Sequence, residues 1–216
     1  MGSGIPGARN VDHVAFTVPD LRRAVDFFVD VLGAETIYWE GPVQDLAGDW
    51  MTRKLNVHER ATARIAMLRL GPTTNLELFE YTAPDQQRRI PENSDHGGHH
   101  LAIYVDDVDV AAEYLRNQPG VRLQGEPETI EEGPLAGNRW MYFTAPWGMQ
   151  LEVVDMPAGM PYEQRTAARK YGPAPCWDNR AEQYRLDAIP SSADANAADD
   201  PHPSRNTGAN LTEKER

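Results

Sequence analysis

The sequence has 216 residues, of which 40% are hydrophobic and 25% are charged, proportions that are ordinary for a soluble globular protein. The formal net charge of −12 at pH 7 argues against nucleic acid or an anionic membrane as the main partner. No stretch approaches the roughly 20 apolar residues that span a bilayer, and the first residues lack the apolar core of a signal peptide. Cys176 is the only cysteine, so no internal disulfide can form and a reducing compartment is the simplest assumption. We therefore expect a cytoplasmic protein that binds neither nucleic acid nor membranes.

After residues 1–10, which are expected to form a flexible N-terminus, one short pattern occurs twice. The stretch VDHVAFTVPD at 11–20 places His13 ahead of an apolar run that ends in an aspartate. The stretch GGHHLAIYVDD at 97–107 does the same with His100, at an offset of 87 residues. An apolar run of this length indicates a strand, and the repetition indicates that the two halves of the chain share one architecture.

A helix is expected directly after each copy of this pattern. Asp20 and Asp107 have short acidic side chains that can accept hydrogen bonds from the first helical turn. The residues that follow have the apolar spacing of a helix, and in both halves they run into a glycine that can end it. The two helices are expected at 21–33 and 108–120.

Three β-rich runs follow each expected helix, and short GPTT and PWG breaks between the last two runs suit hairpin turns. The runs are expected at 34–39, 63–70 and 75–81 in the first half, and at 121–125, 139–145 and 149–155 in the second. The sequence therefore predicts an α+β fold. In this fold two tandem βαβββ modules form a curved eight-stranded mixed sheet with a cleft on its inner side. The modules are expected at 11–82 and 97–157, and together they make one domain, 11–157.

Three segments fall outside the regular pattern. Residues 41–62 form a long insertion in the first module, and long insertions in a compact domain are usually functional or mobile. After residue 157 the periodicity ends, so 158–189 is expected to be a C-terminal extension on the body of the domain. Residues 190–216 are rich in Ala, Asp, Asn, Ser and Pro, cannot bury enough apolar area to offset chain entropy, and are expected to be disordered.

Strand alternation predicts that four polar side chains face the cleft. In the first and last strand of each module the apolar side chains suit packing against the helix, which leaves one histidine and one glutamate on the other face. These residues are His13, Glu77, His100 and Glu152. A strand histidine or glutamate taken singly is more often hydrogen-bonded or solvent-facing than a ligand, but the equivalent placement in both modules favours a metal site. One divalent cation would offset the cost of burying two carboxylates together and would keep two octahedral positions open. His99 could replace His100 if the register slips by one residue.

These stretches resemble the vicinal oxygen chelate superfamily, which includes glyoxalase I, methylmalonyl-CoA epimerase, extradiol dioxygenases and the fosfomycin and bleomycin resistance proteins. The resemblance covers residues 11 to about 157 and rests on VDHVAFTVPDLRRAVDFFVDVLGAE, NLELFEYTAP, GGHHLAIYVDDVD and YFTAPWGMQLEVVD. It implies one divalent ion per site (Zn, Ni, Co, Mn or Fe(II)) at the four positions named above. The glyoxalase and epimerase branches fill all four positions. The dioxygenases and fosfomycin enzymes use two histidines and one glutamate, and the bleomycin-binding members have no metal site.

The resemblance thus implies a metal-dependent isomerase or epimerase, or a glyoxalase-type lyase. In those branches the metal holds two substrate oxygens and stabilises an enediolate while a proton leaves the carbon next to a carbonyl. Glu152 is the expected base, and Glu77, its equivalent in the first module, could serve the other face of the substrate. The expected partners are a small molecule with a carbonyl and an adjacent oxygen, and a second copy of the chain, because relatives are often dimeric. The last motif also resembles epimerases of natural-product and cyclitol pathways.

Two other functions stay open at the level of sequence. An extradiol-type dioxygenase would use ferrous iron and leave Glu77 without a role. A non-catalytic small-molecule binding or resistance protein would use the cleft as an apolar cage. Aromatic side chains on the cleft side of the strands are expected to line the substrate pocket: Phe79, Tyr81, Tyr104, Trp140 and Tyr142. Trp140 and Tyr142 could equally be strand-core residues.

Overall fold

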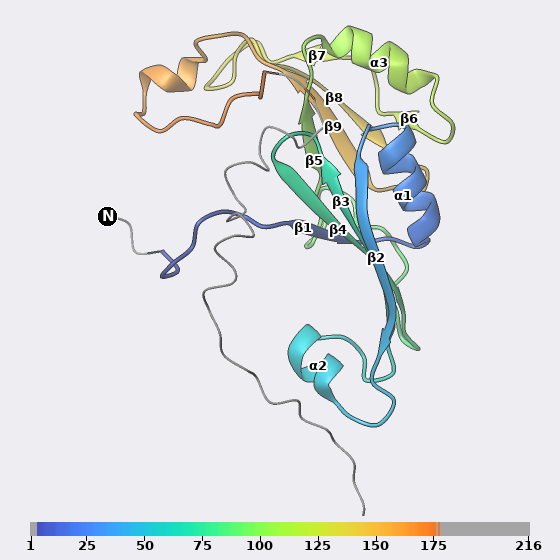
Figure 1. The fold of residues 1–216 in the computed structure, drawn as a ribbon. Helices are drawn as coiled ribbons and strands as arrows, with labels where there is room; N and C mark the ends of the chain where they lie inside the picture. Colours follow the sequence, from blue (N-terminus) through green and yellow to red (C-terminus); the bar gives the residue numbers. More distant parts are fainter. Residues whose placement is uncertain (1–3, 176, 178–216) are drawn as a thin grey trace, which may run out of the picture. The chain divides into compact units, whose positions relative to one another are not determined.

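The computed structural model describes residues 4–175 and Trp177 (Figure 1). The described residues belong to one compact unit that covers residues 1–179. The tail expected at 190–216, the end of the expected C-terminal extension and Cys176 lie outside the described residues. None of the described helices is both long and apolar enough to cross a membrane.

The first module has the expected βαβββ order. Its elements are β1 (Val14–Thr17), α1 (Leu21–Asp30), β2 (Glu35–Gln44), β3 (Thr62–Leu70) and β4 (Thr74–Thr82). The strands form a four-stranded sheet in the order β1-β4-β3-β2. β1 runs parallel to β4, and the other neighbours are antiparallel. The parallel pair brings the start of the module beside its last strand.

The second module repeats this plan with shorter strands. Its elements are β5 (Leu101–Tyr104), α3 (Val108–Arg116), β6 (Arg122–Leu123), β7 (Glu128–Thr129), β8 (Arg139–Thr144) and β9 (Gln150–Asp155). The sheet order is β5-β9-β8-β6, with β7 also paired to β8 and β5 parallel to β9. The short strand β7 was not expected from the sequence. A 3₁₀ helix, η1 (Pro161–Gln164), follows in the C-terminal extension.

Both modules start their helix with two carboxylates. The side chains of Asp20 and Asp107 accept hydrogen bonds from backbone N–H groups of the first turn, as expected of N-caps. A second carboxylate comes from the last strand of the same module and accepts from the first N–H of the helix. Glu80 does so at 2.6 Å in the first module, and Asp155 does so at 3.1 Å in the second. Each helix start is therefore fixed to the strand that also carries a candidate ligand.

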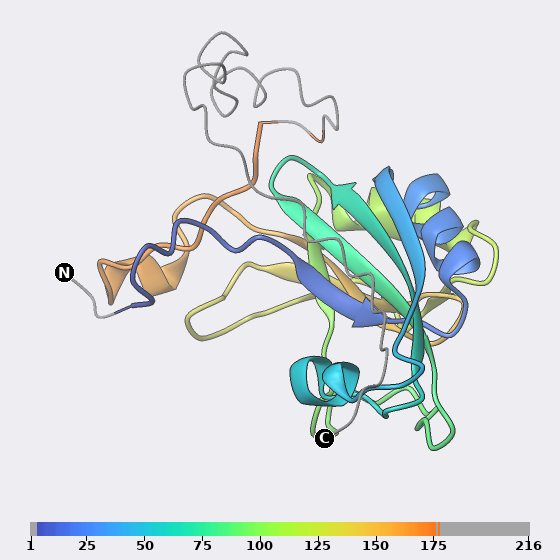
Figure 2. The same ribbon diagram turned by 60° about the horizontal axis from the view of Figure 1, so that its bottom comes forward.

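One hydrophobic core joins the two modules. α1 packs against β2, β3 and β4, and α3 packs against β6, β8 and β9. The helix-facing residues of both sheets belong to a single buried cluster, which includes Phe28, Leu78 and Leu151, all 0% exposed. α1 and α3 lie next to each other in both ribbon views (Figures 1 and 2), and the Tyr114 hydroxyl donates to the Val31 carbonyl at 2.9 Å. The modules thus meet through their helical sides.

The α+β class and the two βαβββ modules are confirmed, and within the described chain the strands form two sheets rather than one continuous surface. β1 and β5 are the edge strands of these sheets. Both sheets turn their helix-facing sides toward the common core, so their other faces point away from it. This arrangement decides where the candidate site residues lie.

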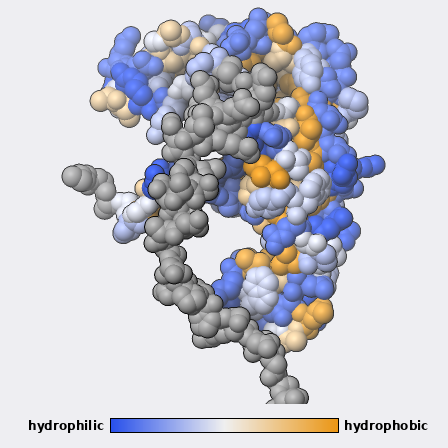
Figure 3. All heavy atoms as spheres, in the orientation of Figure 1, coloured by the Kyte–Doolittle hydropathy of each residue, from blue (hydrophilic) through white to orange (hydrophobic). Residues whose placement is uncertain are grey.

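The expected insertion at 41–62 is partly regular structure. β2 continues to Gln44, and the rest contains the short helix α2 (Trp50–Leu55), which lies apart from α1 and α3 (Figure 1). Met51 is fully buried and anchors the helix, while the Asp45 carboxylate accepts three backbone hydrogen bonds in the turn before it. Hydrophobic side chains are exposed among hydrophilic ones over the first sheet and over this segment (Figure 3).

We expect Asp107→Ala to lower the free energy of unfolding by about 1 kcal/mol, because an N-cap carboxylate satisfies N–H groups that have no partner within the helix. Urea denaturation followed by circular dichroism measures the change. The neighbouring exposed Asp106→Ala is the matched control and should leave stability unchanged. Equal stability of both variants would show that the cap contributes nothing.

Candidate metal centre

The first module pairs His13 with Glu77. Ala15 lies directly opposite Glu77 in the parallel β1–β4 register, so the residue two positions earlier, His13, shares its face. His13 Nε2 is 3.1 Å from Glu77 Oε2. The other ring nitrogen, Nδ1, is 2.8 Å from the Asp12 carboxylate. Asp12 therefore orients the ring so that Nε2 points at the glutamate.

The second module pairs His100 with Glu152 in the same way. Ala102 is opposite Glu152 in the parallel β5–β9 register, and His100 Nε2 is 3.2 Å from Glu152 Oε2. His99 instead stacks on Phe16 with ring centroids 5.2 Å apart, so it is not part of this pair. The two modules thus build equivalent imidazole–carboxylate pairs.

The environment of Glu152 shifts the pKa of its carboxyl group upward. Its side chain is only 14% exposed, and this burial raises the pKa of the carboxyl group, while the nearby His100 and Lys170 act to lower it. Tyr142 lies opposite Glu152 in the β8–β9 register, and its hydroxyl is 3.5 Å from His100 Nε2. Burial, followed by the negative charge of Glu152, raises the pKa of Tyr142. A phenol that keeps its proton can donate a hydrogen bond to this pair or to a ligand.

The donor chemistry of each pair fits a divalent cation, because an imidazole nitrogen and a carboxylate oxygen are ordinary ligands of the first-row metals. However, no three His, Cys, Asp or Glu side chains within the described part of the chain are grouped closely enough to hold a metal ion. The joint role of the four residues in one metal site stays a prediction, and within the described chain they lie as two separate His–Glu pairs. The physical reason is the shared core, which leaves each pair on a sheet face that points away from it.

The aromatic residues expected to line one pocket are divided between the same two faces. Phe79 and Tyr81 stack on the first face, with centroids 5.2 Å apart and planes 7° apart. Trp140 and Tyr142 meet edge-on at 5.3 Å on the second face. Tyr104 lies opposite Val154 in the β5–β9 register, which places it on the second face too.

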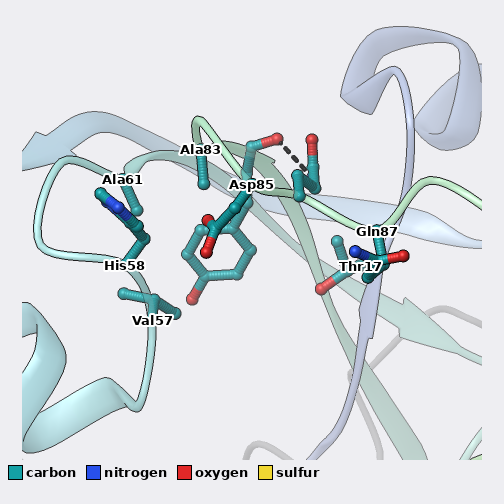
Figure 4. Close-up of a pocket in the computed structure, with 9 residues that line it drawn as sticks. Thr17, Val57, His58, Ala61, Ala83, Asp85 and Gln87 are labelled. Atoms are coloured by element: carbon teal, nitrogen blue, oxygen red, sulfur yellow. Dashed lines mark hydrogen bonds between the residues drawn. The ribbon is translucent and has the colours of Figure 1, made fainter.

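A cavity on the first face was not anticipated from the sequence. It measures about 260 Å³ and lies where β1 and β4 end (Figure 4). Its polar lining comes from β1, the segment after α2, β4 and the linker that follows β4: Thr17, His58, Tyr81, Asp85, Gln86 and Gln87. No periodicity connects these segments, so only the folded chain brings them together.

The C-terminal extension adds Lys170 to the second face, which the sequence also did not predict. The Lys170 backbone N–H donates to the Tyr162 hydroxyl at 3.1 Å, and its Nζ lies 3.5 Å from the sulfur of Met156, which follows β9. Tyr162 itself donates its backbone N–H to the Pro134 carbonyl at 3.0 Å. The extension is thus tied to the second module, and its lysine is near enough to influence the charge of Glu152.

Asp12→Asn should lower the pKa of His13 in the metal-free protein, because the hydrogen bond that His13 Nδ1–H donates to the Asp12 carboxylate is the largest cause that raises this pKa above 6.5, ahead of the charge of Glu77. Since the folded-state pKa is raised, protonated His13 stabilises the fold below about pH 6.5, and this contribution disappears as pH rises through the folded-state pKa. An NMR titration of the imidazole measures the shift. An unchanged or higher pKa in the variant would contradict the role of Asp12.

Several known proteins are similar to this chain. A 2-epi-5-epi-valiolone epimerase from Actinomyces sp. is 67% identical over 178 residues, which cover 82% of this chain and 96% of the relative. A match to 82% of a 216-residue chain must extend past residue 157, so it includes part of the C-terminal extension. The metallothiol transferase FosB of Staphylococcus epidermidis is 25% identical over 147 residues, which cover 67% of this chain and 80% of FosB. The similarity to an epimerase agrees with the expectation of an enzyme.

The fold also matches a solved structure, a glyoxalase family protein from Bacillus cereus. The TM-score is 0.52 at 19% identity, over 71% of this chain and 99% of the other, which supports the fold alone. Residues 10–153 match the Glyoxalase/Bleomycin resistance protein/Dioxygenase superfamily, a range that spans both modules and both His–Glu pairs. The chain therefore belongs to the glyoxalase/bleomycin resistance protein/dioxygenase superfamily.

Proposed function

We propose that this protein is a divalent-metal-dependent epimerase that inverts a carbon next to a ketone, and that its substrate is 2-epi-5-epi-valiolone or a close analogue. The observation that carries the proposal is the 67% identity to an epimerase of that compound over 96% of its length. An alignment over 82% of the chain must include the second module and the extension that holds Lys170. The two equivalent His–Glu pairs support the metal requirement.

Four residues would hold the metal: His13, Glu77, His100 and Glu152. When bound, a divalent cation would supply positive charge to the substrate oxygen that becomes negative as the neighbouring carbon loses its proton. Glu152 would leave the cation to take that proton, because a carboxylate bound to a metal ion is a weak base. Glu77, from the equivalent strand of the other module, takes a proton from water and delivers it to the opposite face of the carbon, as inversion requires, and Glu152 releases its proton to water.

Each complete site forms between two copies of the chain. One chain presents its His13–Glu77 pair and its His100–Glu152 pair on faces that both point away from the shared core. The edge strand β1 of one copy can lie beside the edge strand β5 of another, and Val14 on β1 is 40% exposed in the single chain. A two-fold axis then produces two equivalent sites. The curved sheet expected from the sequence would consist of one module from each copy.

Metal removal and solvent labelling test the reaction. Protein stripped with a chelator should not epimerise 2-epi-5-epi-valiolone, and added Zn, Ni, Co or Mn should restore turnover without oxygen. In heavy water the product should carry one deuterium at the inverted carbon. Glu152→Gln should lower kcat by about 100-fold or more, as loss of a general base does, while the exposed Glu131→Gln is the matched control. Turnover that survives chelation, or product without deuterium, would contradict the proposal.

Mixing two inactive variants tests whether the sites are shared. Glu77→Gln and Glu152→Gln should each be inactive alone. After unfolding and refolding together, mixed dimers should contain one site built from two unaltered pairs, and random pairing predicts about a quarter of wild-type activity. If a site belonged to one chain, no mixture could restore activity. One variant is labelled with ¹⁵N, so that mass spectrometry under native conditions distinguishes mixed dimers from the two homodimers.

A further inference from the structure

We propose that the cavity at the end of β1 and β4 binds the hydroxyl groups of the substrate, and that His58, Asp85 and Gln87 determine specificity for a small polyhydroxylated ring. The inference rests on the proposed function, because it takes the His13–Glu77 face as part of the reaction centre. It assigns a role to the insertion and the linker, neither of which carries a candidate ligand.

The cavity continues the face that carries His13 and Glu77. Thr17 lies four residues after His13, and Tyr81 lies four residues after Glu77 on the parallel strand β4. Both are therefore on the same face as the His–Glu pair and about 13 Å further along the strands. Phe79 lies between Glu77 and Tyr81 and stacks on the tyrosine ring. Burial and then the negative charge of Glu77 raise the pKa of Tyr81, so the carboxylate and the phenol are in electrostatic range. A ring held between Glu77 and the Tyr81 phenol can therefore turn the hydroxyl groups of its far side into the cavity.

The walls of the cavity combine hydrogen-bond donors and acceptors. His58 Nδ1 accepts from the Arg60 backbone N–H at 3.0 Å, so in the neutral ring Nε2 carries the proton and can donate to a ligand. Gln86 donates to the Tyr81 carbonyl at 2.9 Å and thereby fixes the linker against β4. In Figure 4 His58 lies on one side of the cavity, Gln87 lies on the other, and Asp85 lies between them.

The size and chemistry of the cavity fit a sugar-like or cyclitol ring. A cavity of roughly 150 Å³ holds a benzene molecule, so about 260 Å³ has ample room for the hydroxyl-bearing side of a six-membered ring. The face of Tyr81 suits the C–H side of such a ring, while the carboxylate, amide and imidazole groups suit its hydroxyls. A purely apolar ligand would bury these polar groups without partners, which is costly.

Only the first module has this wall. His58 follows α2, which Met51 anchors in the fold. The corresponding part of the second module, residues 124–138, carries β7 instead. One end of the site therefore differs chemically from the other, which lets the protein hold an asymmetric ring in a single orientation.

Two conservative substitutions test the inference in metal-loaded protein. Asp85→Asn keeps the shape of the side chain and removes its charge. His58→Asn keeps an acceptor for the Arg60 N–H and removes the Nε2 donor. Each should raise the KM for 2-epi-5-epi-valiolone about ten-fold or more and leave kcat within about three-fold, the pattern expected when ground-state and transition-state binding weaken equally. Glu59→Gln, exposed and outside the cavity, is the matched control and should change neither.

A binding measurement separates this inference from the proposed reaction. We expect 2-epi-5-epi-valiolone, added to the Glu152→Gln protein, to shift the NMR signals of the His58 ring, and Asp85→Asn in that background to weaken binding about ten-fold. If the metal-loaded wild-type protein binds the compound at His58 but does not epimerise it, the reaction is overturned and the cavity assignment stands. Normal turnover with no His58 shift and an unchanged KM in both variants would overturn the cavity assignment alone. A fall in kcat at constant KM would overturn it too.

Discussion

The packing of both sheets on one hydrophobic core is the constraint on which the rest of the structure depends. The helix-facing residues of the two modules, such as Leu78 and Leu151, must be buried, and they are buried together with α1 and α3 in a single cluster. Their neighbours Glu77 and Glu152 then lie on the opposite faces by strand alternation. The interaction that stabilises the chain thus also presents two equivalent His–Glu pairs on its surface.

Strand alternation made much of this predictable. The parity of the strands places His13 with Glu77 and His100 with Glu152, and the structure has both pairs at hydrogen-bonding distance. The N-caps Asp20 and Asp107 were also readable, because their chemistry is local. The packing of one module against the other was not readable. Alternation tells which residues share a face, but it does not tell whether two sheets meet by their helical sides or along their edges.

Features that depend on distant segments could not be found from the sequence either. Glu80 binds the start of α1 from β4, and its position in the alternating pattern indicates only the side of the sheet. The cavity needs β1, the insertion and the linker in one place. Lys170 approaches Glu152 from a segment without any periodicity. Each of these features has a clear physical cause in the folded chain, but none leaves a pattern within a short window of sequence.

The two irregular segments have complementary positions in the proposed assembly. The cavity belongs to the face of the His13–Glu77 pair, and Lys170 belongs to the face of the His100–Glu152 pair. A site built from one module of each copy would receive the cavity from one chain and the lysine from the other. Two modules of equivalent architecture would thereby form a site with two chemically different ends, as an asymmetric substrate requires.

The central claim is that one metal ion takes an imidazole from each of two chains. The most direct measurement is pulsed electron paramagnetic resonance of Cu(II) bound to dimers refolded from an equal mixture of ¹⁵N-histidine-labelled and unlabelled chains. The account predicts that about half of the ions have one labelled and one unlabelled ring, as random pairing in a two-fold dimer requires. Ions with only two labelled or two unlabelled rings would show that both imidazoles come from one chain, and would contradict it.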